Sequence, residues 1–565
     1  MPIRRSFRPL VWSSLLVVSL VATGFALSRA PIVGVQPDGT ILTPVGQRLT
    51  PAGTQIEVDD RPLGMALSPN HQLLAVVTGS NFASRALHLI DVSTGTLNQT
   101  ISINNSFVGV GFSPSGNKIY VGGGTNDVKV FSLTAGGTYA AAVPPTIPVT
   151  PGSPAPSGLS VSPDGTRVYV ALNQANAVAV IDTATSAVVT RVAVGTYPYT
   201  TVVSADGSKV YVTNWGGKIP TASDFTDGMN PVVVDRRTGI PVSGTVSVID
   251  TASNHLLKTI DVGLHPTGMA LSPRGDRVYV TNANSDTVSV IDTFRDAVVK
   301  TLSVGGVGPG AGPGEGPGNG HGPASAALLG ASPNAVAVSP DGRTLYVANA
   351  SQNAVAVVDV NGPANDAVRG LIPTGWYPTV VALNATGDEL FIGNGYGFGS
   401  IAPATRPGTG RSYTDRVGVV SIVNVPNDKQ LRDYTKQVRD NDQSTPPALD
   451  SKWVTNGDNG GPGGHGHDGP ESPNASGPIP KHLGDKSPIK HVFYIIKENR
   501  TYDQVLGDVK KGNGDPRLVM FGAEVSPNHH KLAEEFVLLD NLYCNGQVSR
   551  DGHPWSTMAY NTDYI

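Results

Sequence analysis

The fold of this chain is decided by a repeated unit, and its clearest copy is LSVSPDGTRVYVALNQANAVAVIDTATSAVVTRVAVG at residues 159–195. The unit opens with a β-rich run that ends in a Ser-Pro-Asp-Gly turn, where proline restricts φ and glycine accepts a positive φ. Three more runs rich in valine, isoleucine and alanine follow, separated by short polar turns, and each has the composition of a strand. Four short strands within about 40–45 residues is the size of one propeller blade.

The turn of this unit recurs along the chain with similar strand-like runs on both sides. Its seven copies begin at Ser68, Ser113, Ser162, Ser204, Ser272, Ser339 and Asn384. The tightest spacing, from Ser162 to Ser204, is 42 residues, whereas the spacings that follow Ser204 and Ser272 are longer by about 25 residues each. The pattern predicts a mainly β protein with seven propeller blades, two of which carry insertions.

Two of the strand motifs carry a family resemblance. The runs Val210-Tyr211-Val212-Thr213-Asn214 and Val278-Tyr279-Val280-Thr281-Asn282 resemble the signature of YVTN-type, YncE-like β-propeller repeats, and the resemblance covers about residues 64–425. It implies a seven-bladed propeller over residues 31–425. Because a propeller must hide its last sheet edge, we expect residues 36–59 to supply the strand that closes the ring.

Composition limits the classes of function. A chain of 565 residues exceeds what one hydrophobic core usually supports, so two or more domains are expected. The net charge is −4 and is spread along the chain, which gives no support for nucleic-acid binding, since that function needs a basic face. The single cysteine, Cys544, leaves no intramolecular disulfide.

The first 30 residues have the pattern of an export signal. Arg4, Arg5 and Arg8 precede an apolar run over residues 10–27, as a signal peptide or an uncleaved N-terminal anchor requires. We therefore expect the rest of the chain to be extracytoplasmic: periplasmic, secreted or in the cell envelope. Membrane contact is expected only through an uncleaved N-terminal segment.

Recurring aspartates follow one strand of several blades, and they could be taken for metal ligands. They are Asp182, Asp250, Asp292 and Asp359. Since they recur from blade to blade, we interpret them as turn residues whose side chains bond to the backbone. The insertion at residues 214–243 is a better functional candidate, because long loops on rigid scaffolds often carry function. It contains Trp215, Asp224, Asp227, Asp235, Arg236 and Arg237.

Two segments are too polar or too rich in glycine to fold alone. Residues 305–324 read GVGPGAGPGEGPGNGHGPAS, so His321 is expected to be solvated. Residues 426–488 are interpreted as a linker, whose glycine-rich part includes His465 and His467.

Beyond the linker the composition changes at HVFYIIKENRTYDQVLGD, residues 491–508. Residues 492–496 are apolar without alternation, which is typical of a strand buried on both faces of an α/β sheet. Such sheets place ligands beyond the carboxyl ends of their strands, where Glu498 and Asn499 would lie. Their oxygen atoms suit a divalent cation, although an ordinary turn is the simpler interpretation of these residues alone.

The same stretch resembles the opening of the phosphoesterase family, which includes phospholipase C-type enzymes and acid phosphatases of the alkaline phosphatase superfamily. The shared signature is the apolar run followed by Glu-Asn-Arg-Thr-Tyr-Asp at residues 498–503. The resemblance implies that Glu498 and Asn499 ligate a divalent metal ion. It covers residues 490–565, so we expect residues 489–565 to be the N-terminal part of an α/β domain, fused to the propeller in a two-part arrangement known for such proteins.

The family nucleophile, a serine or threonine, follows a second strand, which we expect at residues 537–543 after a helix at residues 531–536. Ser549 is the predicted nucleophile, and Ser556 and Thr557 are its rivals. Phospholipase-type members carry a threonine and a Pro-Asn-Arg run here, whereas this chain has Asp551-Gly552-His553. Arg500 and His553 are candidates for contacts to phosphate oxygens.

These features predict an exported metal-dependent phosphoesterase, a hydrolase of phosphate esters, carried on a propeller. A divalent cation of unidentified element would lower the pKa of the Ser549 hydroxyl and neutralise charge on the phosphoryl group. Because the family's remaining ligands lie on later strands, we expect the domain in this chain to be incomplete. The alternative is an extracytoplasmic binding propeller, with a protein or cell-envelope partner at its face or insertion and a non-catalytic C-terminal remnant.

Overall fold

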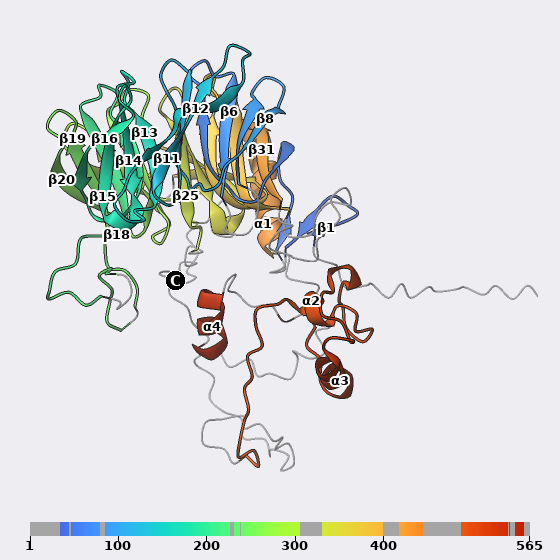
Figure 1. Cartoon of the computed structure of the whole chain (residues 1–565). Helices are drawn as coiled ribbons and strands as arrows, with labels where there is room; N and C mark the ends of the chain where they lie inside the picture. Colours follow the sequence, from blue (N-terminus) through green and yellow to red (C-terminus); the bar gives the residue numbers. More distant parts are fainter. Residues whose placement is uncertain are drawn as a thin grey trace, which may run out of the picture.

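The computed structural model describes residues 34–43, 47–79, 85–226, 231–237, 239–305, 330–365, 367–398, 417–443, 487–540, 542 and 549–558. Seven antiparallel sheets of four strands follow one another along the chain and form a propeller, as the repeats predicted (Figure 1). The export signal, His321, His465, His467 and Cys544 lie outside the described residues.

The first four blades have these strands. Blade 1 has β5 (Pro62–Leu67), β6 (Leu73–Thr78), β7 (Ala86–Asp91) and β8 (Thr96–Ser102). Blade 2 has β9 (Val110–Phe112), β10 (Lys118–Gly122), β11 (Asp127–Leu133) and β12 (Tyr139–Pro148). Blade 3 has β13 (Pro156–Val161), β14 (Arg167–Leu172), β15 (Ala177–Asp182) and β16 (Ala187–Ala193), with a 3-10 turn at Asn173–Ala175. Blade 4 has β17 (Thr196–Val203), β18 (Lys209–Gly217), β19 (Gly244–Asp250) and β20 (His255–Val262).

The remaining three blades complete the ring. Blade 5 has β21 (Pro266–Leu271), β22 (Arg277–Asn282), β23 (Thr287–Asp292) and β24 (Ala297–Ser303). Blade 6 has β25 (Pro333–Val338), β26 (Thr344–Asn349), β27 (Ala354–Asp359) and β28 (Val368–Pro373), with a 3-10 turn at Ala350–Gln352. Blade 7 has β29 (Trp376–Leu383), β30 (Glu389–Gly397) and β31 (Gly418–Asn424), and its fourth strand is β4 (Thr54–Val58) from the N-terminal side of the chain.

The closing strand joins the two ends of the propeller. β4 pairs antiparallel with β31, and Ser421 lies opposite Gln55 and donates a hydrogen bond of 2.7 Å from its hydroxyl to the Gln55 side-chain oxygen. This pairing covers the edge that blade 7 would otherwise expose. The prediction that residues 36–59 close the ring is confirmed.

The first strand of each blade lies nearest the axis. Contacts join the first strands of successive blades, from β5 and β9 round to β29 and back to β5. The fourth strands form the rim, and β8, for example, is mostly exposed. The hydrophobic core therefore lies between neighbouring sheets, as where Val128 and Val130 of blade 2 pack with Val168 and Val170 of blade 3. Valine suits these positions because it favours the strand conformation and because its burial between the sheets stabilises the fold.

The recurring polar turns are held by side chains. In six blades the serine that begins the turn accepts a hydrogen bond from the backbone N–H five residues later, as between Ser162 and Arg167 at 2.9 Å. The recurring aspartates act in the same way, and the Asp182 carboxylate accepts from the N–H groups of Ala184 and Thr185. Their interpretation as turn residues is confirmed.

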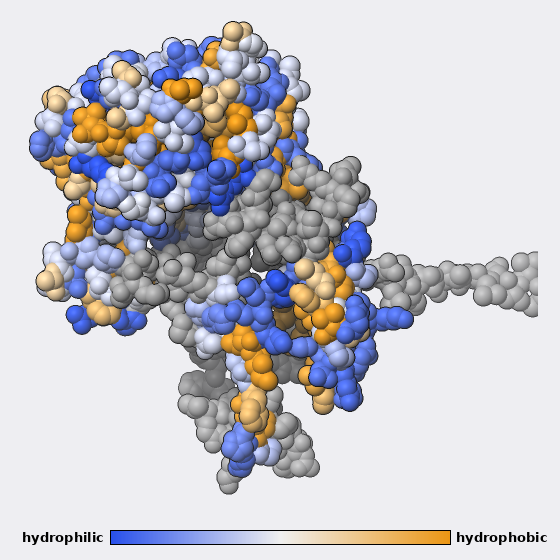
Figure 2. Space-filling view, in the orientation of Figure 1, coloured by the Kyte–Doolittle hydropathy of each residue, from blue (hydrophilic) through white to orange (hydrophobic). Residues whose placement is uncertain are grey.

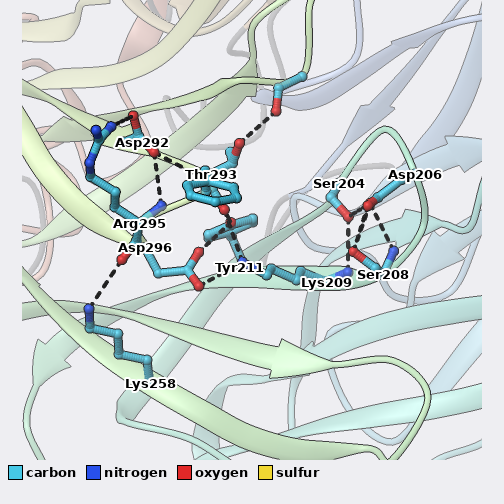
Figure 3. A network of polar contacts seen from close by, with 12 residues as sticks. Ser204, Asp206, Ser208, Lys209, Tyr211, Lys258, Asp292, Thr293, Arg295 and Asp296 are labelled. Carbon is cyan, nitrogen blue, oxygen red and sulfur yellow. Dashed lines mark hydrogen bonds and ion pairs between the residues drawn. The ribbon is translucent and has the colours of Figure 1, made fainter.

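One polar network ties two neighbouring blades together (Figure 3). The Tyr211 hydroxyl of β18 donates to Asp296 at 2.7 Å, and the Lys209 ammonium group donates to the other Asp296 oxygen at 2.7 Å. The Lys209 ammonium group also donates to the carbonyl of Thr293 at 2.9 Å, in the turn between β23 and β24, and the Tyr211 hydroxyl oxygen lies 3.3 Å from the same carbonyl oxygen. Tyr211 is fully buried, so this clasp joins the middle of blade 4 to the outer turn of blade 5.

A helix forms where a linker was predicted. α1 (Asp428–Gln443) packs against β28 and buries Leu431 and Val438, and Thr435 donates its hydroxyl to the helix while its oxygen accepts from the Leu371 N–H. The linker interpretation of residues 426–488 is therefore wrong for this part, because the apolar residues of the helix have a blade surface to cover. A small sheet of β1 (Gly34–Val35), β2 (Ile41–Leu42) and β3 (Arg48–Leu49) lies beside it.

The C-terminal segment contains α2 (Tyr502–Leu506), a 3-10 turn at Pro516–Leu518, α3 (Pro527–Glu535) and α4 (Ser549–Met558). The helix expected near residues 531–536 is confirmed. The strands expected at residues 492–496 and 537–543, and the α/β fold built on them, are wrong for the described residues of this segment, which contain no strand. Val492 and Phe493 are 81% and 89% exposed, and Figure 2 shows orange atoms along this extended segment. Without a neighbouring strand, such a run has no ladder to join.

Candidate functional site

Three predicted site residues meet in the C-terminal segment. The His553 Nε2 atom lies 3.0 Å from the Glu498 Oε2 atom, although the two residues are 55 positions apart. The Ser549 hydroxyl also hydrogen-bonds to the Glu498 carboxylate. Ser549 and His553 are one helical turn apart on α4, so their side chains share a face of that helix.

The carboxylate at the centre of this group is charged and accessible. The hydrogen bond from Ser549, followed by the interaction with His553, holds the pKa of Glu498 below its usual value. Side chains of Glu498 and His553 are 48% and 46% exposed. A solute can therefore reach the Ser549 hydroxyl and the two groups that flank it.

The rival nucleophiles are bonded differently. The Ser556 hydroxyl donates to the carbonyl of Gly552 at 2.9 Å, and the Thr557 hydroxyl donates to the carbonyl of His553 at 2.8 Å. Both hydroxyls are thus directed back along α4, as serine and threonine inside helices commonly are. Ser549 alone among the three candidates bonds to a carboxylate.

Asn499 and Arg500 do not join the group. Asn499 is exposed, and among the described residues no hydrogen bond links its side chain to Glu498. The Arg500 guanidinium lies over the Phe521 ring, 5.5 Å from its centroid, in a cation–π contact. The structure therefore assembles Glu498, Ser549 and His553 and leaves the other two predicted residues apart.

The donor set around Glu498 does not form a metal site by itself. Within the described residues there is no group of three or more His, Cys, Asp or Glu side chains that could hold a metal ion. Glu498 already accepts hydrogen bonds from Ser549 and His553, and among the described residues no hydrogen bond joins the Asn499 side chain to this group. We therefore derive no chemical step through a metal ion.

A second polar group in this segment was missed by sequence reasoning. The His530 Nε2 atom lies 2.7 Å from Asp508, and its Nδ1 atom lies 3.1 Å from the Ser526 hydroxyl oxygen. The bond to Asp508 raises the pKa of His530, and the Ser526 hydroxyl donates to the Phe521 carbonyl at 2.8 Å. This arrangement fixes the start of α3 and leaves no free base for Ser526. The i, i+4 spacing of Ser526 and His530 was the available sequence signal.

The insertion of blade 4 is held by local contacts. Lys218 pairs with Asp224 at 3.1 Å, and the Arg236 guanidinium lies over the Phe225 ring, 4.8 Å from its centroid. Asp235 accepts from the Arg237 backbone N–H, which is a turn contact. Of the predicted residues in this insertion, Asp227 lies outside the described residues.

Comparison with known protein families gives a match within the propeller. The model of the family described as lactonase, seven-bladed β-propeller, matches residues 109–297. The seven observed blades make the described core a seven-bladed β-propeller, and the matched stretch of it is similar to this lactonase family. The matched stretch lies within the propeller, and the comparisons give no support to a phosphoesterase domain at residues 489–565.

Two other comparisons complete the description. The chain is similar in fold to a solved structure described as Kuenenia stuttgartiensis hydrazine synthase, with 18% sequence identity and a TM-score of 0.48. That similarity covers 66% of this chain and 98% of the other. No curated protein matches the sequence. In the described part of the chain, no helix is long and apolar enough to cross a membrane.

Proposed function

We propose that this protein is an exported phosphoesterase carried on a β-propeller, and that Ser549 is its nucleophile. The observation that supports the proposal most strongly is the shared hydrogen bonding of Ser549 and His553 to the Glu498 carboxylate. Three predicted site residues meet in space, although Glu498 lies 55 positions before His553 in the chain. Nucleophilic catalysis needs a nucleophile within hydrogen-bond reach of a base, and a further polar group that orients the base.

The chemistry follows from these side chains. The Ser549 oxygen attacks the phosphorus atom of a phosphate ester, and its proton passes to the Glu498 carboxylate to which it is bonded. The bond from phosphorus to the leaving oxygen breaks, and the leaving alcohol takes up the proton that Glu498 received. Water then attacks the phosphoserine and gives a proton to Glu498, which passes it to the Ser549 oxygen as the bond from that oxygen to phosphorus breaks and phosphate is released. His553 holds the carboxylate in place, so it is a positioning residue in this scheme.

The family resemblance also implies a divalent cation on Glu498 and Asn499, of an element that the sequence does not identify. When bound, such a cation would polarise phosphoryl oxygens and favour ionisation of the serine. The described residues offer only part of a ligand set, so the cation stays a proposal that rests on the resemblance. Treatment with EDTA followed by single-metal addition tests it directly.

The test of the proposal is hydrolysis of p-nitrophenyl phosphate and bis-p-nitrophenyl phosphate by the full chain. We expect Ser549→Ala to lower kcat by at least about 10³-fold, as loss of a nucleophile does. Glu498→Gln should keep the fold and lower kcat by about 10²-fold or more, because a general base contributes about that much. Mass spectrometry of acid-quenched enzyme should find the phosphate on the peptide that contains Ser549.

Matched hydroxyl variants make the test specific. Ser556→Ala and Thr557→Val remove hydroxyls that bond back to the helix, and we expect both to retain wild-type kcat. Equal activity in wild type and Ser549→Ala, or no hydrolysis by the wild-type chain under any metal condition, would refute the proposal.

The second candidate function is ligand binding by the propeller outside the cytoplasm, with a C-terminal segment that does not act in catalysis. It is favoured by the side chains around one end of the propeller axis, which differ from blade to blade on a repeated backbone. If a protein or cell-envelope partner binds at this face, the Ser549→Ala variant should bind that partner as tightly as the wild type does. Binding and hydrolysis are separate readouts, so the two functions can be tested in the same preparation.

A further inference from the structure

Each blade carries one residue at the same place, at or near the start of its innermost strand. It stands seven positions before the residue that begins the recurring turn. In six blades this residue precedes a proline and has a positive φ, between 49° and 62°: Arg61, Ala155, Tyr197, His265, Ser332 and Tyr377. In blade 2 the place is taken by Ser106, and Phe107 replaces the proline. Since the innermost strands surround the axis, these residues form a ring around one end of it.

The backbone of this ring is repeated, but its side chains are not. Blades 1, 4, 5 and 7 carry arginine, tyrosine, histidine and tyrosine, whereas blades 2, 3 and 6 carry serine or alanine. A purely architectural position needs only the repeated backbone. Unlike side chains on a rigid, repeated scaffold are typical of a binding face.

Aromatic rings converge at this end of the axis. Tyr199 and Trp215 of blade 4 are stacked, with ring centroids 4.1 Å apart, and Trp215 also contacts His265 of blade 5 at 4.8 Å. Phe107 of blade 2 meets Tyr199 edge to face at 6.0 Å. Blades 2 and 4 are not neighbours, so this contact is made on the axial side of blade 3. We call these four residues the axial aromatic cluster.

A second set of rings approaches from the other side of the axis. Tyr377 and Trp376 of blade 7 contact Tyr396 at 5.3 and 5.0 Å, and the Arg61 guanidinium of blade 1 lies 5.7 Å from the Tyr396 centroid. Burial, and next the nearby Tyr377, raise the pKa of Tyr199 in the axial aromatic cluster. The two sets therefore face one another across the end of the propeller.

The axial aromatic cluster is accessible but carries no charge near neutral pH. All four of its side chains are half-buried, whereas core rings such as Tyr211 and Phe391 are fully buried. Burial lowers the pKa of His265 to about 4, so its imidazole is neutral. The raised pKa keeps the Tyr199 hydroxyl protonated. Aromatic faces are thus combined with neutral donors and acceptors.

One hydrogen-bond donor of the axial aromatic cluster has no acceptor among the described residues. The indole Nε1 atom of Trp215 is buried and has no hydrogen-bond partner among the described residues. An unpaired buried donor costs about 1–3 kcal/mol, so such a group calls for an explanation. The stacking on Tyr199 fixes the orientation of the indole, which would preorganise this donor for an acceptor brought in by a ligand.

The insertion of blade 4 starts beside the same residue. Trp215 is followed by Gly216, and a Cβ atom there would lie 2.9 Å from the Cγ2 atom of Val232. The missing side chain lets buried Val232 of the insertion pack directly against the end of β18. The insertion therefore borders the axial aromatic cluster and can contact the part of a ligand that extends beyond it.

We propose that the axial aromatic cluster binds a neutral sugar ring. The apolar C–H face of a sugar suits an aromatic ring, and its hydroxyl groups both donate and accept, as the indole N–H, the phenol and the neutral imidazole require. A charged ligand is disfavoured, because the cluster would desolvate its charge without supplying an opposite one. This site is independent of Ser549 and does not rest on the proposed hydrolysis.

The test is a titration of the full chain with methyl β-D-glucopyranoside, methyl β-D-galactopyranoside and N-acetyl-D-glucosamine, followed by calorimetry and tryptophan fluorescence. We expect at least one of them to bind in the millimolar range. Trp215→Phe keeps a ring but removes the N–H group, and it should weaken binding by about fivefold or more. Ala155→Tyr gives blade 3 the tyrosine that blade 4 carries at the equivalent position, Tyr197. The added ring should fill space at this end of the axis and block sugar binding.

Matched controls separate binding from folding. Phe294, on an outer turn of blade 5, is 91% exposed, so Phe294→Ala should bind as wild type. Ser549→Ala should do the same, whatever its effect on hydrolysis. The proposal is overturned if no neutral sugar binds at about 20 mM, if Trp215→Phe or a correctly folded Ala155→Tyr binds as tightly as wild type, or if D-gluconate binds better than the neutral sugars.

Discussion

The clasp between blades 4 and 5 gives a quantitative prediction about the stability of the ring. Tyr211→Phe removes one hydroxyl and leaves the shape of the ring unchanged, so it deletes the 2.7 Å bond to Asp296 without creating a cavity (Figure 3). The Asp296 side chain is only 15% exposed, and therefore little water can replace the lost donor. A hydrogen bond to a charged group contributes about 1.5–3 kcal/mol, so we expect the free energy of unfolding to fall by about 2 kcal/mol.

A double-mutant cycle isolates this interaction. Asp296→Asn removes the charge of the carboxylate to which both Tyr211 and Lys209 donate. In that background Tyr211→Phe should lower the free energy of unfolding clearly less than it does in the wild type. We expect a coupling energy of about 1 kcal/mol, which is typical of residues in direct contact. Urea unfolding followed by both fluorescence and circular dichroism measures it, and coincident curves would justify a single free energy of unfolding.

The control for the clasp is the equivalent tyrosine of the next blade. Tyr279 is 2% exposed and occupies the same motif position, but its hydroxyl has no hydrogen-bond partner within the described residues. Tyr279→Phe should therefore change the free energy of unfolding by less than about 0.5 kcal/mol. If the two substitutions cost the same, or if the costs of Tyr211→Phe and Asp296→Asn simply add, the clasp does not contribute as argued.

Three further predictions concern the ring closure and two histidines. Gly53→Ala should lower the urea midpoint, because at a φ of +73° its Cβ would meet a backbone oxygen of β31 at 2.0 Å, whereas Gly39→Ala, at +81° in open space, should cost much less. Because the folded-state pKa of His265 is lowered to about 4, stability should fall as pH drops from about 6.5 toward 4, by up to about 1.4 kcal/mol per pH unit, and His265→Phe should remove this dependence. The pKa of His530 is raised by Asp508, so this ion pair stabilises α3 fully below about pH 6.5 and its contribution is lost as pH rises through the folded-state pKa. In NMR titrations His530 should titrate above about 6.5, and Asp508→Asn should bring its pKa down toward that value. Equal midpoints for the two alanine variants, an unchanged acid slope in His265→Phe, or an unshifted His530 titration would each contradict the reasoning.

The propeller could be predicted almost completely from the sequence because its determinants are local. Each blade is specified by turn residues and by β-branched strands that lie within about 40–45 positions of one another. The closing strand was foreseen as well, since a ring of sheets leaves an edge that some other segment has to cover. Repetition also showed that aspartates such as Asp182 are turn residues and not metal ligands, because a functional site normally occurs once in a protein and these aspartates recur from blade to blade.

The C-terminal segment shows where local pattern fails. Residues 492–496 have the composition of a buried strand, but a strand exists only where a neighbour accepts its backbone hydrogen bonds, and the described residues give it none. α1 is the opposite case. Its sequence is polar and was interpreted as a linker, and the helix is explained only by its packing against β28, which buries Leu431 and Val438. Both errors concern partners that are distant in the chain.

By itself, then, the sequence determined the blades, their number, their closure and the candidates Glu498, Ser549 and His553. Only the tertiary structure decided that these three meet while Ser556 and Thr557 bond back to their own helix. It also decided that Phe107 meets Tyr199 across a blade, beside an unpaired Trp215 N–H group. The physical reason is that strand and turn preferences act over a few residues, whereas a site depends on which distant side chains the closed ring brings into contact.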